Sequence, residues 1–301
     1  TPTPPDITCR PQANTTVDVL PTPSVNTVAN QTHCTGSTVP SIVFTSSTPG
    51  ATFSWSRTVP TPDIGLAATS GSGNVPSFIA NPAITVPVTA TFSVVASYSN
   101  GEVTCTGTPI QFTITINPTP QVNAVSNQTY CTGSTVPSIV FTSNIPGAAF
   151  SWSRTVPVPD IGLAPTSGSG NVPTFITTNT SNAPITSTFS VVATFTNNGV
   201  TCTGTPIQFT ITVNPSPQVN AVANQTYCAG ASVPSVVFTS NVPGATFSWS
   251  RTVPTPDIGL AATSGTGSVP MFTATNTSTA PITSTFSVVA TYSNNGVTCT
   301  G

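Results

Sequence analysis

The sequence predicts an all-β protein built from tandem β-sandwich domains in a linear array. Three observations support this fold class: a long internal repeat, short segments in which apolar and polar residues alternate, and no segment with helical periodicity. The repeat is clearest in the segments that begin at residues 53, 150 and 247, which lie 97 residues apart and differ at one position. A repeat of this size matches an immunoglobulin-like sandwich, which has ~100 residues.

The Asn-Pro linker between copies sets the expected domain boundaries. We expect repeat 1 at residues 22–118, repeat 2 at 119–215 and repeat 3 at 216–301, with repeat 3 missing its last strand. Residues 1–21 align with the end of a repeat and are expected to form the C-terminal strand of a preceding one. The chain begins at Thr1 and shows no signal peptide or anchor, so we expect a mature, processed or excised segment.

The two ends of the chain allow two interpretations. The first is an arbitrary window cut from a longer array. The second is donor-strand polymerisation, in which residues 10–20 of one chain complete repeat 3 of another. We favour the first, because any cut through a 97-residue repeat leaves complementary ends, both ends keep a cysteine, and the tail strand is degenerate.

Alternation predicts the strands within a repeat. In the segment TFSVVASY, Phe92, Val94, Ala96 and Tyr98 share one face, as expected for a half-buried strand. The next strand, IQFTITINP, alternates in the same way, and an Asn-Gly pair between the two supplies the positive φ of a tight hairpin. Further strands are expected in QVNAV, PSIVFTS and TFSWSR, the last with Trp55 as a buried anchor of the core.

Charge is scarce, with 3% of residues charged and a net charge of −2. The chain has no lysine, and its basic residues are Arg10, Arg57, Arg154 and Arg251. This composition offers no electrostatic footprint for nucleic acid or anionic lipid. No apolar run approaches the ~18 residues that cross a bilayer, so we expect no membrane insertion.

The residues for catalysis or metal binding do not recur, and we expect no enzyme. The one histidine, His33, is replaced by Tyr130 and Tyr227 in the other repeats, so neither a nucleophile–base pair nor a zinc set is repeated. One acid per repeat is too few for Ca²⁺, which takes ~6–8 oxygen ligands, and paired carboxylates are absent. We therefore expect no catalytic, cofactor-binding or metal-binding residues, and no cofactor.

Each repeat carries one arginine and one aspartate in the segment after its tryptophan. One interpretation is a ligand contact repeated along the array; the other, which we favour, is a structural ion pair that holds the loop. The pairs are Arg57 with Asp63, Arg154 with Asp160 and Arg251 with Asp257.

Four motifs recur in every repeat where the chain is long enough to hold them. They are Cys-x-Gly-x-x-Val-Pro-x-Ile/Val-x-Phe-Thr-Ser, Pro-Gly-x-x-Phe-Ser-Trp, Ile-Gly-Leu-Ala and Cys-Thr-Gly-Thr-Pro. Together they resemble the PKD-like repeats of giant Bacteroidota surface proteins, of the gliding-adhesin type. The resemblance covers essentially the whole chain. It implies an immunoglobulin-like fold and an extracellular, cell-surface location, and it implies no binding site.

The cysteines occur at regular positions and are expected to form disulfides. They are Cys9, Cys34, Cys105, Cys131, Cys202, Cys228 and Cys299. In one interpretation, the two cysteines within a repeat pair with each other. In the other, an immunoglobulin-like strand order places them at opposite ends of a sandwich ~30 Å long, beyond the ~7 Å reach of a disulfide. Cys34 would then pair with Cys202, and Cys131 with Cys299. Both interpretations remain open at this point.

Function follows from the repeat rather than from a site. The leading hypothesis is a stiff, disulfide-stabilised stalk or filament shaft of a large secreted surface protein, whose partners are neighbouring repeats of the same polypeptide. The repeated Pro-x-Pro linkers favour extended backbone and limited swing. The alternatives are repeats that bind a surface ligand (glycan or protein) and a homopolymer formed by strand donation or lateral packing.

Overall fold

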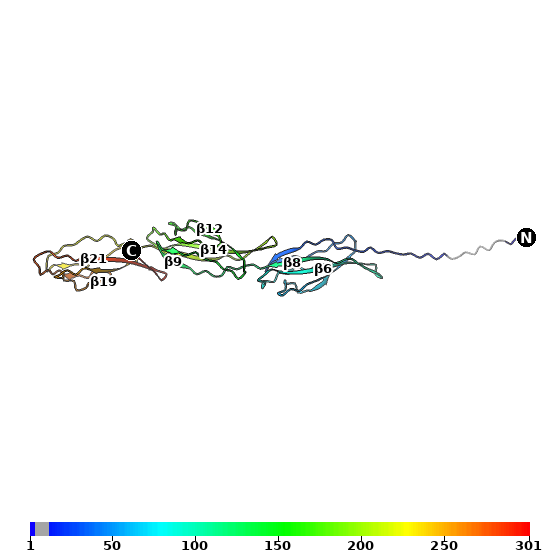
Figure 1. Cartoon of the computed structure of the whole chain (residues 1–301), viewed down its shortest axis with the longest axis horizontal. Coiled ribbons are helices and arrows are strands. Elements are labelled where there is room, and N and C mark those ends of the chain that lie inside the picture. The colour runs from blue at the N-terminus through cyan, green and yellow to red at the C-terminus, as the bar shows by residue number, and fades with distance from the viewer. Residues whose placement is uncertain (4–11) are drawn as a thin grey trace. The chain divides into compact units, whose positions relative to one another are not determined.

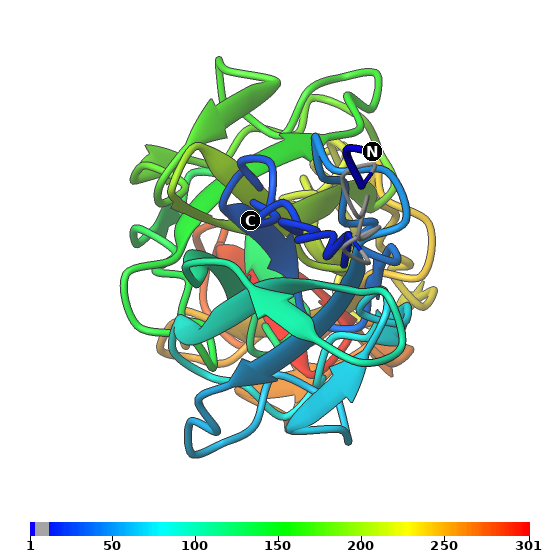
Figure 2. The same cartoon turned by 90° about the vertical axis from the view of Figure 1, so that its right-hand side faces the viewer.

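The structure is a computed structural model that describes residues 1–3 and 12–301 of the chain. Every regular element in this part of the chain is a β-strand, as Figures 1 and 2 show from two perpendicular directions. The chain divides into two compact units. Unit 1 is Thr1–Thr119 with Thr196–Cys202, and unit 2 is Pro120–Phe195 with Thr203–Gly301.

Repeat 1, in unit 1, is a sandwich of a larger and a smaller sheet. The larger sheet has the order β1-β8-β6-β3-β4, with β7 paired to β6, and the smaller one joins β2 to β5. Strand β1 runs parallel to β8, and the other pairs are antiparallel. The strands are β1 (Gln31–Cys34), β2 (Thr38–Val39), β3 (Thr52–Arg57), β4 (Ser70–Ser72), β5 (Phe78–Ile79), β6 (Val88–Ser99), β7 (Thr104–Thr106) and β8 (Ile110–Asn117).

The core of repeat 1 lies between the two sheets and follows the alternation in the sequence. Phe92 and Val94 of β6 are fully buried, as are Ile114 and Ile116 of β8. The rings of Phe92 and Phe112 stack with centroids 5.0 Å apart. Burying each such side chain contributes about 1.5–3 kcal/mol relative to exposure. The all-β, tandem immunoglobulin-like sandwich fold is therefore confirmed.

Trp55 of β3 covers a glycine on the neighbouring strand. Gly71 of β4 pairs with Trp55, and a Cβ built on Gly71 would lie 2.7 Å from the ring carbon Cζ2. The same contact recurs between Trp152 and Gly168 and between Trp249 and Gly265. Glycine at this position thus makes room for the buried indole ring.

Two strand expectations need correction, and repeat 2 shows why. The segment QVNAV is not a strand: Val122 makes a single β-bridge to Ser143. Val122 and Val125 both turn toward the core, and a spacing of three does not fit the two-residue period of a strand. The following segment QTYC does form a strand, which the sequence analysis missed because it carries no apolar alternation.

Unit 2 holds most of repeat 2 and all of repeat 3. In repeat 2 the sheet order is β12-β11-β14-β16-β9, with β15 paired to β14, and β10 pairs with β13. The strands are β9 (Gln128–Cys131), β10 (Thr135–Val136), β11 (Ala149–Arg154), β12 (Ser167–Ser169), β13 (Phe175–Ile176), β14 (Ile185–Asn197), β15 (Val200–Thr203) and β16 (Ile207–Asn214). The tip of the β14–β15 hairpin, residues 196–202, belongs to unit 1.

Repeat 3 has a smaller sheet, with the order β19-β18-β21-β22, and a pair of β17 with β20. Its strands are β17 (Ser232–Val233), β18 (Thr246–Arg251), β19 (Ser264–Thr266), β20 (Phe272–Thr273), β21 (Phe286–Asn294) and β22 (Val297–Thr300). In repeat 2, Phe189 and Val191 on β14 are fully buried beneath β16. The equivalent Phe286 and Val288 on β21 are only half-buried, and no strand covers that edge in the described chain.

Candidate functional site: the disulfide-linked junctions

The junction in unit 1 is built around a disulfide between residues of two different repeats. Cys34, the last residue of β1, is bonded to Cys202 of β15, with their Cα atoms 5.6 Å apart. They are 168 residues apart in the sequence. Cys34 and Cys105, the two cysteines of repeat 1, are not joined. The site that the structure assembles is thus a crosslink between repeats.

An asparagine at the end of β8 completes this junction. The side chain of Asn117 is fully buried, and its Nδ2 donates to the backbone carbonyl oxygen of Asn197 at 2.9 Å. In return, Asn197 Nδ2 donates to Asn117 Oδ1 at 2.9 Å. The backbone carbonyl of Asn117 lies 3.9 Å from Cys202 Sγ. The hairpin tip is therefore held to β8 by amide hydrogen bonds next to the disulfide.

The hairpin turn presents these groups through left-handed backbone. Asn198 has a φ of 50° and Gly199 a φ of 73°, and Asn295 and Gly296 take similar values in repeat 3. Asparagine and glycine tolerate this region better than other residues, which is the reason for the Asn-Gly signal in the sequence. The turn leaves the carbonyl groups of residues 197 and 200 free to accept bonds from Asn117.

Unit 2 contains a second junction of the same design. Cys131 of β9 is bonded to Cys299 of β22, with a Cα–Cα distance of 5.5 Å. Asn214, which ends β16 and is fully buried, donates to the backbone carbonyl of Asn294 at 3.2 Å and accepts from Asn294 Nδ2 at 2.9 Å. The arrangement is thus a property of the repeat.

The sequence analysis missed these asparagines. Asn117 and Asn214 had served only as markers of the Asn-Pro linker, and Asn197 and Asn294 only as turn residues. A signal was present, because both positions recur at the 97-residue spacing. What the sequence does not state is that residues 80 apart meet.

The remaining cysteines stand apart from the two crosslinks. Cys105 is half-buried and Cys228 is exposed, and neither forms a disulfide with another residue that the structure describes. Cys9 lies outside the described residues, as does Arg10. Cys105 and Cys228 hold the same places in their repeats as the bonded cysteines do in theirs.

The arginine–aspartate pairs lie within single repeats, away from the junctions. Arg57 is buried, and its Nη2 contacts Asp63 Oδ2 at 2.8 Å. The guanidinium group also donates to the backbone carbonyls of residues 58, 66 and 68. Arg154 with Asp160 and Arg251 with Asp257 repeat this geometry. Because the arginine is almost fully covered by its own loop, it is poorly placed to contact a ligand.

The pKa of one of these carboxyl groups departs from its ordinary value. The side-chain hydrogen bond from Arg251 lowers the pKa of Asp257 below the ordinary 3.8, and desolvation acts in the opposite direction. The ionised form of Asp257 is therefore stabilised in the folded protein.

His33 forms a local contact. Its Nε2 lies 3.0 Å from Gln31 Oε1, and in repeat 2 the hydroxyl of Tyr130 donates to Gln128 Oε1 at 2.7 Å. Partial burial lowers the pKa of His33. The position thus supplies a hydrogen bond to a glutamine two residues earlier, whether it holds His or Tyr.

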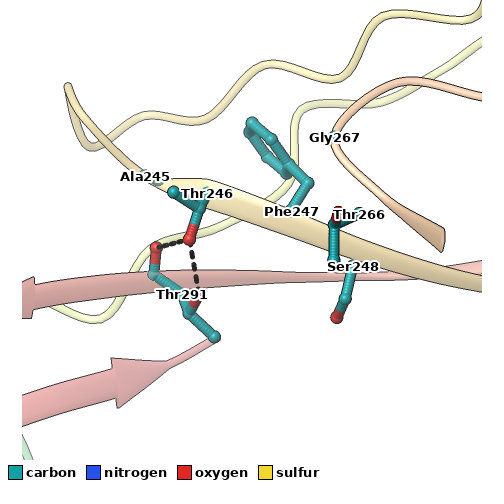
Figure 3. A pocket seen from close by; sticks show the side chains of 7 residues that line it. All are labelled: Ala245, Thr246, Phe247, Ser248, Thr266, Gly267 and Thr291. Carbon is teal, nitrogen blue, oxygen red and sulfur yellow. Dashed lines mark hydrogen bonds between the residues drawn. The ribbon is translucent and has the colours of Figure 1, made fainter.

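A shallow hollow on repeat 3 is the most marked concavity in the described part of the chain. Figure 3 shows it on the outer side of β18 and β21, where the Thr246 and Thr291 hydroxyls lie 2.9 Å apart. None of its seven lining residues is ionisable: Ala245, Thr246, Phe247, Ser248, Thr266, Gly267 and Thr291. Residues 1–3 and 12–301 contain no cluster of three or more His, Cys, Asp or Glu side chains that could hold a metal ion.

The described residues form no helix long and apolar enough to cross a membrane. No protein-family model matches the chain, and no curated protein matches its sequence.

Several solved structures resemble the chain at low sequence identity. Mouse cadherin-23 EC22-24 has a TM-score of 0.39 and 16% identity over 93% of this chain and 96% of that one. Human CDH23 EC21-23 has a TM-score of 0.39 and 12% identity over 91% and 96%. Drosophila N-cadherin EC1-4 has a TM-score of 0.30 and 13% identity, covering 91% of this chain and 72% of that one. At these scores, function has to be argued from the chain's own residues.

Proposed function

We propose that the chain is a stretch of a disulfide-stapled extracellular stalk, in which each repeat is crosslinked to the next and holds other parts of its parent protein away from a surface. The observation that carries the proposal is the pair of disulfides, Cys34–Cys202 and Cys131–Cys299, which join residues of successive repeats. A disulfide inside one repeat would stabilise that repeat alone. A disulfide between repeats resists their separation and their rotation about the linker.

The location follows from the same bonds. Structural disulfides form and persist in oxidising surroundings outside the cytosol. The lysine-free surface, rich in Thr, Ser and Asn, suits exposure to proteases that cleave at lysine. The recurring motifs resemble those of large Bacteroidota surface proteins, and we assign the chain to a protein of that kind.

The proposal includes the repeat boundaries 22–118, 119–215 and 216–301, with residues 1–21 as the end of a preceding repeat. It gives Arg57, Arg154 and Arg251 and their aspartates a structural part, because each arginine closes its own loop with bonds to backbone carbonyls. Ligand binding by each repeat is not favoured by any such contact.

The first experiment is peptide mapping by mass spectrometry without reduction, using a protease suited to a chain without lysine. We expect peptides that contain Cys34 linked to Cys202 and Cys131 linked to Cys299. Peptides in which Cys34 is linked to Cys105 would overturn the stalk proposal, because the repeats would then be independent domains joined by hinges.

Single-molecule extension tests the mechanical consequence. A fully extended chain gains about 3.3–3.6 Å per residue. The disulfides shorten the covalent path from Cys34 to Cys299, 265 residues apart, to the 71 residues that separate Cys131 from Cys202. We expect the oxidised chain to stop extending at this shorter path. The matched control, Cys34→Ser with Cys131→Ser, should extend to its full length, and equal extension of the two chains would contradict the proposal.

A further inference from the structure

Repeat 3 exposes the place where the last strand lies in the other two repeats. In repeats 1 and 2, β8 and β16 each lie between a long strand and a short parallel strand. In repeat 3, Phe286 and Val288 of β21 are half-buried at the corresponding edge, and residues 221–230 are all exposed. Asn30 and Asn127 accept a backbone hydrogen bond from the last strand of their own repeat, from Thr113 and Thr210 respectively. The equivalent Asn224 has no such bond among the described residues.

Residues 12–20 show the opposite condition, a strand pattern with no sheet. Val17 and Val19 are 82% and 88% exposed, with polar residues at 16 and 18. By alignment of VDVLP with ITINP, these valines correspond to Ile114 and Ile116 of β8, which are fully buried. Two apolar side chains at strand spacing are thus left in solvent.

The residues that follow this segment enter repeat 1 as a real last strand enters the next repeat. The carbonyl oxygen of Leu20 lies 4.0 Å from Cys105 Sγ, as that of Asn117 lies 3.9 Å from Cys202 Sγ. A Cβ on Gly107 would fall 2.0 Å from the Pro23 carbonyl oxygen, and one on Gly204 would fall 1.9 Å from that of Pro120. Residues 20–23 therefore hold the register of a junction.

From these observations we infer that repeat 3 binds a second copy of this chain, whose residues 17–20 add the missing strand beside β21. The added strand would bury Val17 and Val19 against Phe286 and Val288 and would pair its backbone with the open edge. The inference rests on the proposed function, because it extends the same junction from within one chain to between two.

The register then brings two thiols together. In both intramolecular junctions, the cysteine after the short parallel strand meets the hairpin cysteine of the following repeat. With residues 17–20 of the second copy in place, its Cys105 lies opposite Cys228 of the first, as Cys202 lies opposite Cys34. Leu20 stands where Asn117 stands in the other junctions, so this contact lacks the amide pair and depends on strand burial and the disulfide.

The bond between copies forms by thiol–disulfide exchange with a small-molecule disulfide such as oxidised glutathione. One thiolate attacks that disulfide and releases one glutathione thiol. The second thiolate attacks the mixed disulfide and releases the other, so the Cys105–Cys228 bond carries away two electrons and two protons in total.

The test uses the 301-residue chain with Cys9→Ser, so that Cys105 and Cys228 are the thiols outside the two intramolecular bonds. After incubation with oxidised glutathione, we expect a ladder of multimers on a non-reducing gel and one intermolecular peptide, Cys105 linked to Cys228. Cys228→Ser should abolish the ladder. Val17→Asp with Val19→Asp should slow multimer formation by about tenfold or more, since each 1.4 kcal/mol of lost binding is a factor of ten.

The matched control for the strand is Thr16→Asp, which places carboxylates at 16 and 18 on the opposite face and should leave the ladder unchanged. Both valines are exposed in the free chain, so their replacement leaves folding intact. Monomers with free Cys105 and Cys228, or symmetric dimers through either cysteine, would overturn the inference. If the same map retains Cys34–Cys202 and Cys131–Cys299, the stalk proposal survives; if it lacks them, that proposal fails separately.

Discussion

Asn117 and Asn197 bind each other in both directions. Asn197 Nδ2 donates to Asn117 Oδ1 at 2.9 Å, and Asn117 Nδ2 donates to the backbone carbonyl of Asn197 at the same distance. The Asn117 side chain is shielded from water at this contact, beside the Cys34–Cys202 bond. A buried amide that is fully bonded defines one register, since any shift would leave its polar atoms without partners.

Replacing Asn117 by alanine should loosen the junction without disturbing the core of repeat 1. The change leaves the Asn197 amide and two hairpin carbonyls without their partner, and unpaired buried polar groups cost about 1–3 kcal/mol. We expect faster amide hydrogen exchange at residues 196–202. Gln111→Ala, an exposed change on the same strand, is the control, and equal exchange in the two variants would contradict the role assigned to Asn117.

The disulfide at this junction should contribute measurably to stability. Bonds that close long loops typically stabilise a protein by about 2–4 kcal/mol. Cys202→Ser should lower the free energy of unfolding in urea by about that amount, while Cys105→Ser should have little effect because its thiol forms no disulfide with a described residue. With reductant present, the two variants should converge. A persistent difference under reduction would point to packing at Cys202 rather than to the bond.

Gly71→Ala should destabilise repeat 1 through a clash with Trp55. The added methyl group would lie 2.7 Å from the ring carbon Cζ2, and overpacking of this kind costs about 1–3 kcal/mol. The φ of Gly71 lies outside the left-handed region, so the loss reports packing rather than backbone strain. Thermal unfolding followed by Trp fluorescence provides the measurement, with the exposed neighbour Ser72→Ala as the control. A stable Gly71→Ala chain would show that the ring can shift.

Acid should weaken repeat 3 through Asp257. Its pKa is lower in the folded protein than in the unfolded chain, so its contribution is present above the ordinary pKa of 3.8 and is lost as the pH falls through the folded value. The free energy of unfolding should therefore decline below about pH 4. In Asp257→Asn this part of the decline should be missing, as urea titrations at several pH values can measure. An unchanged pH profile would show that the ion pair does not couple to folding.

Much of the fold could be predicted from the sequence, because its signals are local. Alternation places Phe92 and Val94 on the buried face of β6, and it does the same for Ile114 and Ile116 on β8. The 97-residue repeat then extends each assignment to the other copies. The turn residues identify the hairpin, since Asn and Gly are the residues that accept its left-handed backbone.

The rest depends on contacts that leave no local pattern. QTHC and QTYC pair through backbone hydrogen bonds with a strand about 80 residues away, and nothing in their apolar spacing announces it. The cysteine spacing allowed pairing within or between repeats. Only the position of Cys34 at the end of β1 and of Cys202 on the hairpin distinguishes the two.

The two disulfides overlap along the chain, and this affects how it tolerates a broken backbone. Cys34–Cys202 spans every peptide bond between those residues, and Cys131–Cys299 spans every bond from 131 to 299. A single proteolytic nick anywhere from residue 34 to residue 299 therefore leaves the pieces covalently attached. Between 131 and 202, where both bridges run side by side, the polypeptide is doubly secured.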